Sequence, residues 1–88
     1  MKESNDSFAV FTFTTTHQAM KAEDVLREHG FVLEVIPPPR GLGAGCGLAL
    51  RLAARDVPAA MEALRAKHAG WAAVNRLDPA GQAQERLD

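Results

Sequence analysis

A single cysteine, Cys46, lies in the stretch "PPPRGLGAGCG" at residues 37–47. Gly45 and Gly47 flank it, and glycines leave a neighbouring sulfur open to a bulky or protein-borne partner. Arg40, on the same loop, could place positive charge beside a thiolate, which is the nucleophilic form of cysteine. This combination of residues favours an accessible nucleophilic sulfur held on a loop.

The same loop has a plainer interpretation. A lone cysteine at the entrance to a strand is often a small buried apolar residue. Glycines commonly serve turn geometry and prolines stiffen loops, while Arg40 could be a solvated surface residue. The histidines His17, His29 and His68 are scattered, so with one cysteine they lack the paired spacing of zinc ligands. We therefore expect neither a metal ion nor another cofactor.

The elements that must position this loop follow from the apolar pattern. Short runs rich in apolar and β-branched residues predict strands at 8–13, 31–36, 47–52 and 71–77. After the first strand, Thr15 and Gln18 form a capping box and Gly30 stands where a helix C-terminal glycine belongs, which predicts a helix. Asp56 is the expected cap of a second helix, which ends at Gly70.

The order of these elements predicts the fold. The two halves echo each other in "VLREHGF" and "ALRAKHAGW". Two similar split units in the order βαββαβ indicate an α+β, ferredoxin-like two-layer sandwich. Its antiparallel four-stranded sheet would have the order 4-1-3-2, with both helices on one face. An alternative pairs the halves differently, as in other small two-layer carrier domains.

Length and composition limit the organisation and the partners. A chain of 88 residues holds one domain, expected at 8–78, with a disordered tail at 1–7 and a polar tail at 79–88. A net charge of -1 without a basic stripe argues against nucleic acid. No signal-peptide pattern or membrane-length apolar run is present, so we expect a cytoplasmic protein away from membranes.

The predicted topology places the cysteine. The first strand ends, the first helix begins and the loop turns at the same edge of the sheet, which would bring Cys46 near the start of that helix. A helix N-terminus offers free N–H groups and about half a positive charge, which favour a thiolate. Hydroxyls of Thr15 and Thr16 and the ring of His17 could add hydrogen bonds to the sulfur, although His17 could equally be a partly exposed polar residue.

Three pieces in order carry a family resemblance: "FTTTHQAMKAEDVL", "VIPPPRGL" and "CGLALR". Over about residues 8–78 the chain resembles the selenium/sulfur carrier protein-like family of small bacterial and archaeal domains, formerly a domain of unknown function. The resemblance implies that Cys46 is the carrier atom and that Arg40 and Thr16 match family positions. The chain departs from the family pattern at Pro38 and in "GLGAG", where members have hydroxyl side chains.

Three functions follow as hypotheses. In the first, Cys46 holds sulfur or selenium as a persulfide or selenosulfide between a donor and an acceptor protein, which makes the chain a carrier rather than a turnover enzyme. In the second, the chain is a non-catalytic interaction module. It would form a homodimer through an open sheet face, since Val10 alternates with Phe11 and Phe13 on the first strand. In the third, Cys46 is a thiol redox sensor.

Overall fold

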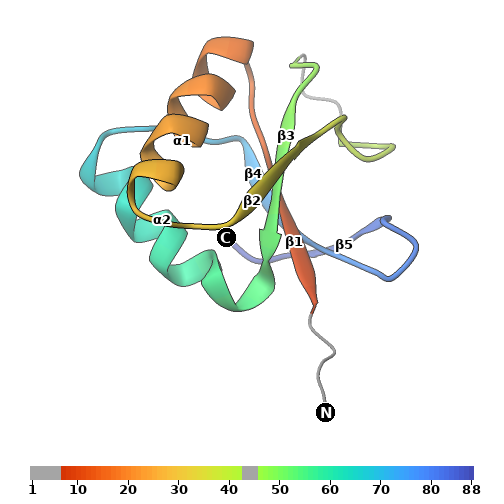
Figure 1. The fold of residues 1–88 in the computed structure, drawn as a ribbon. Coiled ribbons are helices and arrows are strands. Elements are labelled where there is room, and N and C mark those ends of the chain that lie inside the picture. Colours follow the sequence, from red (N-terminus) through yellow and green to blue (C-terminus); the bar gives the residue numbers. More distant parts are fainter. Residues whose placement is uncertain (1–6, 43–45) are drawn as a thin grey trace.

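One open antiparallel sheet with two helices against one of its faces makes up the described chain, which a computed structural model gives for residues 7–42 and 46–88 (Figure 1). In chain order the elements are β1 Phe8–Thr12, α1 Thr16–Glu28, β2 Leu33–Ile36, β3 Ala49–Ala53, the 3-10 turn η1 Ala54–Asp56, α2 Val57–Ala66, β4 Ala73–Leu77 and β5 Ala83–Arg86. The two helices and the first four strands are those that the sequence predicts.

The strand order is β2-β3-β1-β4-β5, and every neighbouring pair is antiparallel. The first four strands have the expected order 4-1-3-2, but the expected number of strands is wrong. Residues 83–86 form β5 on the outer edge of β4. The apolar pattern could not reveal this strand, because an edge strand can form through backbone pairing and polar side-chain contacts alone.

The main core lies between the sheet and the helices. On β1, Ala9 and Phe11 belong to this core and are fully buried. The helices contribute residues at helical spacing, including Leu26 of α1 and Leu64 of α2, which are also fully buried. This packing fixes α1 and α2 on the same side of the sheet and determines where each helix begins relative to the strand ends.

The other face of the sheet carries a second, smaller apolar cluster. Val10, Ala49 and Leu77 are buried there, and the partly buried Ile36 and Leu42 pack against them. We expected an open apolar face that needs a partner, but Val10 has no exposed surface. The chain therefore buries the centre of this face itself, and Leu42, in the segment that follows β2, is one of the residues that pack there.

The two helices end by the same backbone motif with different residues. After α1, Gly30 has φ +85° and Phe31 N donates to Leu26 O at 3.0 Å. After α2, His68 has φ +55° and Ala69 N donates to Leu64 O at 2.8 Å. The prediction that Gly70 ends α2 is therefore wrong, since the left-handed residue that closes this helix is a histidine.

Candidate thiol site at the start of the first helix

The start of α1 is closed by two reciprocal hydrogen bonds. Thr15 has extended backbone angles, φ -133° and ψ 156°, and its Oγ1 accepts from Gln18 N at 3.1 Å. The Gln18 side chain reaches back, and its Oε1 accepts from Thr14 N at 3.0 Å. The predicted pairing of Thr15 with Gln18 is confirmed. The Gln18 side chain, however, accepts from the backbone N–H of Thr14 and not from that of Thr15, the N-cap residue.

Cys46 lies beside this helix start, as the topology predicts. Its Sγ is 3.8 Å from Oγ1 of Thr16, the first residue of α1. Leu48 N donates to the sulfur at 3.3 Å, and the sulfur also lies 3.4 Å from Leu48 O, to which a thiol hydrogen can point. The sulfur therefore has a backbone donor on one side and a hydroxyl, which can rotate to donate or accept, on the other.

The sulfur is not open to solvent, which corrects the expectation of an accessible thiol. Cys46 is 5% exposed and belongs to the main core together with Phe13. Short polar contacts to Leu48 hold the side chain inward, so the absence of neighbouring side chains at a glycine does not by itself expose it. The structure thus combines the two interpretations of the sequence: the cysteine is buried and it lies at the helix start.

Gly47 contributes less to the site than the sequence suggests. Gly47 is exposed, and a Cβ added there would meet nothing within 4 Å, so packing does not require a glycine. Gly45 lies outside the described residues. Of the two expected flanking positions, only Gly47 can be placed, and it leaves free space next to the cysteine.

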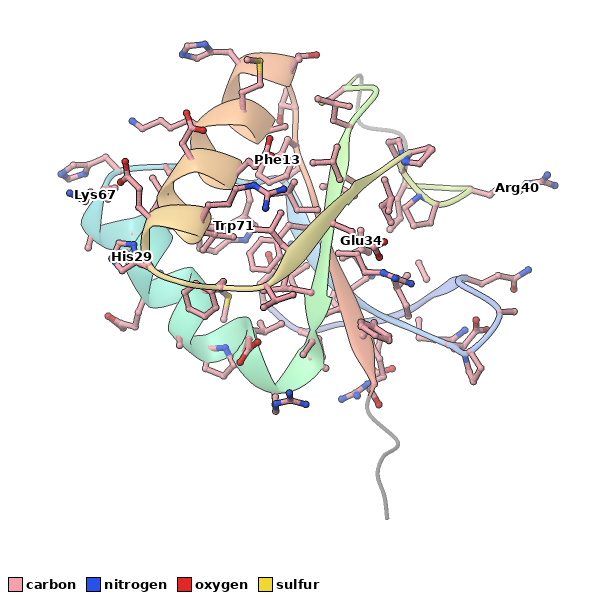
Figure 2. The ribbon with its side chains drawn as sticks, in the orientation of Figure 1. Phe13, His29, Glu34, Arg40, Lys67 and Trp71 are labelled. Carbon is pink, nitrogen blue, oxygen red and sulfur yellow. The ribbon has the colours of Figure 1, made fainter. Side chains whose placement is uncertain are left out.

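Arg40 lies away from the sulfur. Gly41 has φ +89° and Leu42 N donates to Pro39 O at 3.1 Å, so the chain turns at this point. Figure 2 shows Arg40 at the tip of the turn, where its side chain extends away from α1. Its charge therefore faces solvent, and the positive end of α1 is the nearer source of favourable potential for Cys46.

The remaining expected residues have separate places. Thr15, Thr16 and His17 are all exposed at the start of α1. The hydroxyl of Thr15 is engaged by the amide of Gln18, whereas that of Thr16 is the one near the sulfur. Within the described part of the chain, the polar groups recorded around Sγ belong to Thr16 and Leu48.

Sequence reasoning missed Gly70 as part of this region. A Cβ on Gly70 would lie 3.3 Å from Nε2 of Gln18. Gly70 therefore allows the connection between α2 and β4 to pass close to the side chain that closes the start of α1. Because "HAG" at 68–70 resembles "HG" at 29–30, the sequence predicts a helix end at Gly70. It gives no sign of the contact between Gly70 and Gln18, which are far apart in the chain.

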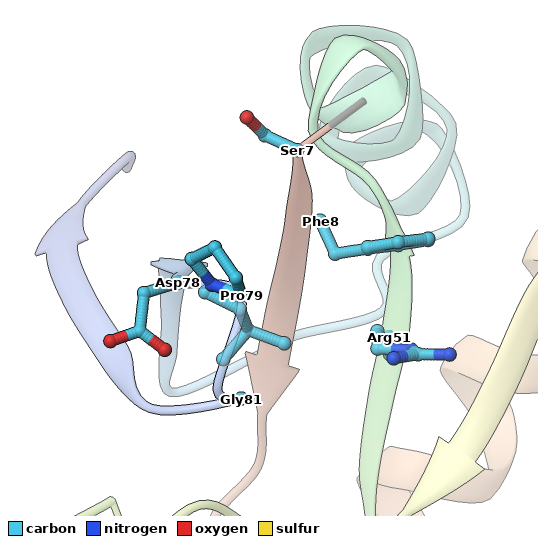
Figure 3. A pocket seen from close by; sticks show the side chains of 7 residues that line it. Ser7, Phe8, Arg51, Asp78, Pro79 and Gly81 are labelled. Atoms are coloured by element: carbon cyan, nitrogen blue, oxygen red, sulfur yellow. The ribbon is translucent and has the colours of Figure 1, made fainter. Parts of the chain in front are cut away.

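Two hollows in the surface lie far from the cysteine. One of about 430 Å³ is lined by Phe8, Arg51, Leu77 and Pro79 among others (Figure 3). A second, of about 420 Å³, shares Phe8 and Arg51. Phe8 begins β1, whereas the start of α1 follows the other end of that strand, so neither hollow serves the thiol.

Two kinds of feature are missing from the described residues. They contain no group of three or more histidine, cysteine, aspartate or glutamate side chains arranged to hold a metal ion. Of the helices in this part of the chain, none is both long and apolar enough to cross a membrane. Among the described residues, the groups that the structure places around the sulfur are the Leu48 amide, the Thr16 hydroxyl and the first turn of α1.

Comparison with known proteins adds to this geometry. A family described as "Putative Se/S carrier protein-like" has a model that matches residues 8–76, which extends from the first residue of β1 into β4. No curated protein and no solved structure matches the chain. The match includes Cys46 and all of α1, and it ends before β5.

Proposed function

We propose, from the premise that this chain belongs to the Se/S carrier protein-like family, that Cys46 carries a sulfur or selenium atom from a donor protein to an acceptor protein. The observation that supports this role most is the position of Sγ at the start of α1, with Leu48 N at 3.3 Å. An N–H donor and the positive end of a helix both stabilise a sulfur anion. The composition is consistent with a cytoplasmic setting.

The transfer step needs no outside oxidant. The Cys46 thiolate attacks the outer sulfur of a donor persulfide, the donor sulfur–sulfur bond breaks, and the donor leaves as a thiolate. Cys46 then holds the persulfide. An acceptor thiolate attacks the outer sulfur in turn and regenerates the Cys46 thiolate, so the protein is unchanged after one cycle. With a selenosulfide donor, the Cys46 thiolate attacks the outer selenium, the donor sulfur–selenium bond breaks, and the donor again leaves as a thiolate.

The burial of the sulfur imposes a condition on this transfer. At 5% exposure, Cys46 must become more accessible than it is in this structure before a protein-borne persulfide can reach it. Gly47, which is exposed and has free space around it, is the described neighbour that obstructs such an approach least. We therefore expect small persulfides to load the sulfur more readily than a protein-borne donor loads it.

Loading can be tested on the purified protein. The reduced protein is mixed with a low-molecular-mass persulfide and then digested, and the mass of the peptide that contains Cys46 is measured. We expect one added sulfur atom, which disappears when a thiol acceptor is supplied. Cys46→Ser should gain nothing. Thr16→Val removes the hydroxyl near the sulfur while it keeps a similar shape, and should shorten the lifetime of the persulfide.

The alternative functions give different masses. Added oxygen, or a disulfide between two copies in place of added sulfur, would support the thiol redox sensor and would contradict the carrier. An unmodified Cys46, under conditions in which free cysteine becomes a persulfide, would also contradict the carrier. Loading without any release to an acceptor would show storage and not delivery, so the proposed transfer would be wrong.

A further inference from the structure

Residues 78–88, which we call the strap, lie outside the family match and cover the outer edge of β4. The strap contains a turn, β5 and the two residues that follow it (Figure 1). Asp78 organises the turn: its Oδ1 accepts from Ala80 N at 3.0 Å and from Gln82 N at 2.8 Å. The turn is thus closed by its own hydrogen bonds and can stay formed without β4.

The pairing between β5 and β4 is irregular, and apart from Leu87, which packs against the main core, the contacts of the strap are mostly polar. The Cα register records Asn75 opposite Arg86 and Leu77 opposite Ala83, with an irregularity between the two pairs. By contrast, β1 pairs with β3 and with β4 through five consecutive residues each. Most of β5 is exposed, with burial pattern ieee from Ala83. Little apolar area therefore holds β5 to the sheet.

The strap buries one polar atom without a partner on the strand beneath it. Asn75 is 6% exposed, and its Nδ2 donates to Gln84 O at 2.9 Å. Its Oδ1 is buried and has no hydrogen-bond partner among the described residues. A buried acceptor without a partner costs free energy. The unpaired Asn75 Oδ1 therefore offsets part of the stability that the hydrogen bond from Asn75 Nδ2 to Gln84 O gives to this contact.

A single carboxylate provides the strongest attachment. Asp88 is held by Trp71 Nε1 at 3.0 Å and by Val74 N at 3.2 Å, the latter on β4. Arg86 contributes two more donors at 3.0 and 3.2 Å. The Asp88 side chain is 13% exposed, and the guanidinium of Arg65 in α2 lies 5.6 Å from the Trp71 ring centroid. The carboxylate thus links the end of the strap to the start of β4.

The charge of this carboxylate matters for the attachment. Burial by itself raises the pKa of the Asp88 carboxyl. The hydrogen bonds from Arg86, the Val74 amide and Trp71 outweigh this effect and hold the pKa below its ordinary value. A lowered pKa means that the charged form contributes stability above the unfolded-state value of about 3.9, and that this stability is lost as pH falls through the lower folded-state value.

We propose that the strap detaches from β4 as a unit while the rest of the domain stays folded, with the Asp88 carboxylate as its latch. Apart from Leu87, the attachment is polar, whereas each of β1 to β4 contributes buried residues to the main core, so the strap belongs to the least stable part of the molecule. Detachment uncovers the backbone edge of β4 and the indole N–H of Trp71. The strap is therefore a conformational device at the outer edge of the sheet.

Hydrogen exchange on the full chain tests the proposal. In Asp88→Asn, the amide of Leu87, which donates to Val74 O of β4, should exchange about tenfold faster or more, whereas the amide of Asp78, which donates to Gln82 O within the turn, should change little. Amides of β1 and β3 should change by less than about twofold. Acrylamide quenching of Trp71, the single tryptophan, should rise in parallel. Asp24→Asn, an exposed site on α1, is the matched charge control and should change neither measurement.

A second variant keeps the proposal testable if Asp88→Asn does not fold. Trp71→Phe removes the indole donor and retains an aromatic ring beside Phe11, whose centroid is 5.9 Å from that of Trp71. It should give the same selective exchange. Equal acceleration in the strap and in β1 and β3 would overturn the proposal, because the strap would then unfold only with the domain. Unchanged exchange in the strap would overturn the role of the latch.

Discussion

The two helix starts occupy equivalent positions in the two half-units but are built differently. At the start of α1, Thr15 is extended, its side chain is bonded to Gln18 N, and Cys46 lies alongside. At the start of α2, Asp56 has helical angles, φ -86° and ψ -8°, and makes no side-chain capping bond. The prediction that Asp56 caps α2 is therefore wrong in its contact, though right in its position.

The cause of this difference is the path of the chain into each helix. β3 continues through the turn η1 directly into α2, so Asp56 is already wound and its carboxylate does not face the first amides. Residues 13–15 lead from β1 into α1, and the extended backbone of Thr15 turns its hydroxyl onto the helix end. The two half-units thus share a topology, but only the start of α1 has a side-chain cap and lies beside the Cys46 thiol.

The largest expected effect on the free energy of unfolding comes from the buried apolar residue at the start of each helix. Phe13 is 1% exposed just before α1, and Val57 is 3% exposed as the first residue of α2. Phe13→Ala should lower the free energy of unfolding by about 3–5 kcal/mol, and Val57→Ala by about 2 kcal/mol because fewer carbon atoms are removed. Urea denaturation measures both. Met20→Ala, at an exposed site, is the control, and equal losses at Phe13 and Val57 would contradict the comparison.

The caps themselves give the next effect. Thr15→Ala should cost about 1 kcal/mol of stability because the Gln18 amide loses its acceptor. Asp56→Ala should change stability by less than about 0.5 kcal/mol, since no capping bond is lost. Thr15→Ser keeps the oxygen and is the control. If thermal unfolding showed a larger loss for Asp56→Ala than for Thr15→Ala, the two starts would not differ as described.

The helix ends sharpen the comparison of the half-units. His68 has φ +55°, so His68→Gly should raise the free energy of unfolding by about 0.5–1 kcal/mol. Gly30→Ala, at φ +85°, should lower it by about 1 kcal/mol. His68→Asn tests whether tolerance of the left-handed conformation is the cause and should be close to neutral. Destabilisation by His68→Gly would show that the imidazole makes contacts worth more than the backbone strain.

The smallest effect probes the contact that joins the two half-units. Gly70→Ala lowers the conformational entropy of the unfolded chain, which favours the folded state, but its Cβ pushes against Nε2 of Gln18, so its net change should be within about 0.5 kcal/mol. In a Gln18→Ala background the obstacle is gone, and the same change should stabilise by about 0.4–1 kcal/mol. A double-mutant cycle measures the coupling. Identical effects in both backgrounds would mean that Gly70 does not constrain the start of α1.

Much of the fold could be predicted because its signals are local. Short runs rich in apolar and β-branched residues predict the first four strands, and Thr15, Gln18 and Gly30 mark the limits of α1. The topology then brought Cys46 to the start of that helix, where the structure places it. These features depend on residues close in sequence or on strand order, and both can be derived from the chain alone.

The remaining features depend on side-chain direction and long-range polar contacts. Cys46 faces inward because Leu48 holds its sulfur, and Arg40 faces outward because the chain turns at Gly41. β5 is attached by polar groups such as the Asp88 carboxylate, which no periodicity marks. Neither the burial of a single cysteine nor the pairing of a polar edge strand can be derived from residue spacing.

The most direct test of the central claim is the mass of the Cys46 peptide from protein isolated from its host without reductant and with free thiols alkylated at once. We expect a population that carries one added sulfur or selenium atom at Cys46, absent from a Cys46→Ser variant expressed in the same way. A thiol that is always free, oxygenated or joined to a second copy would contradict the carrier role.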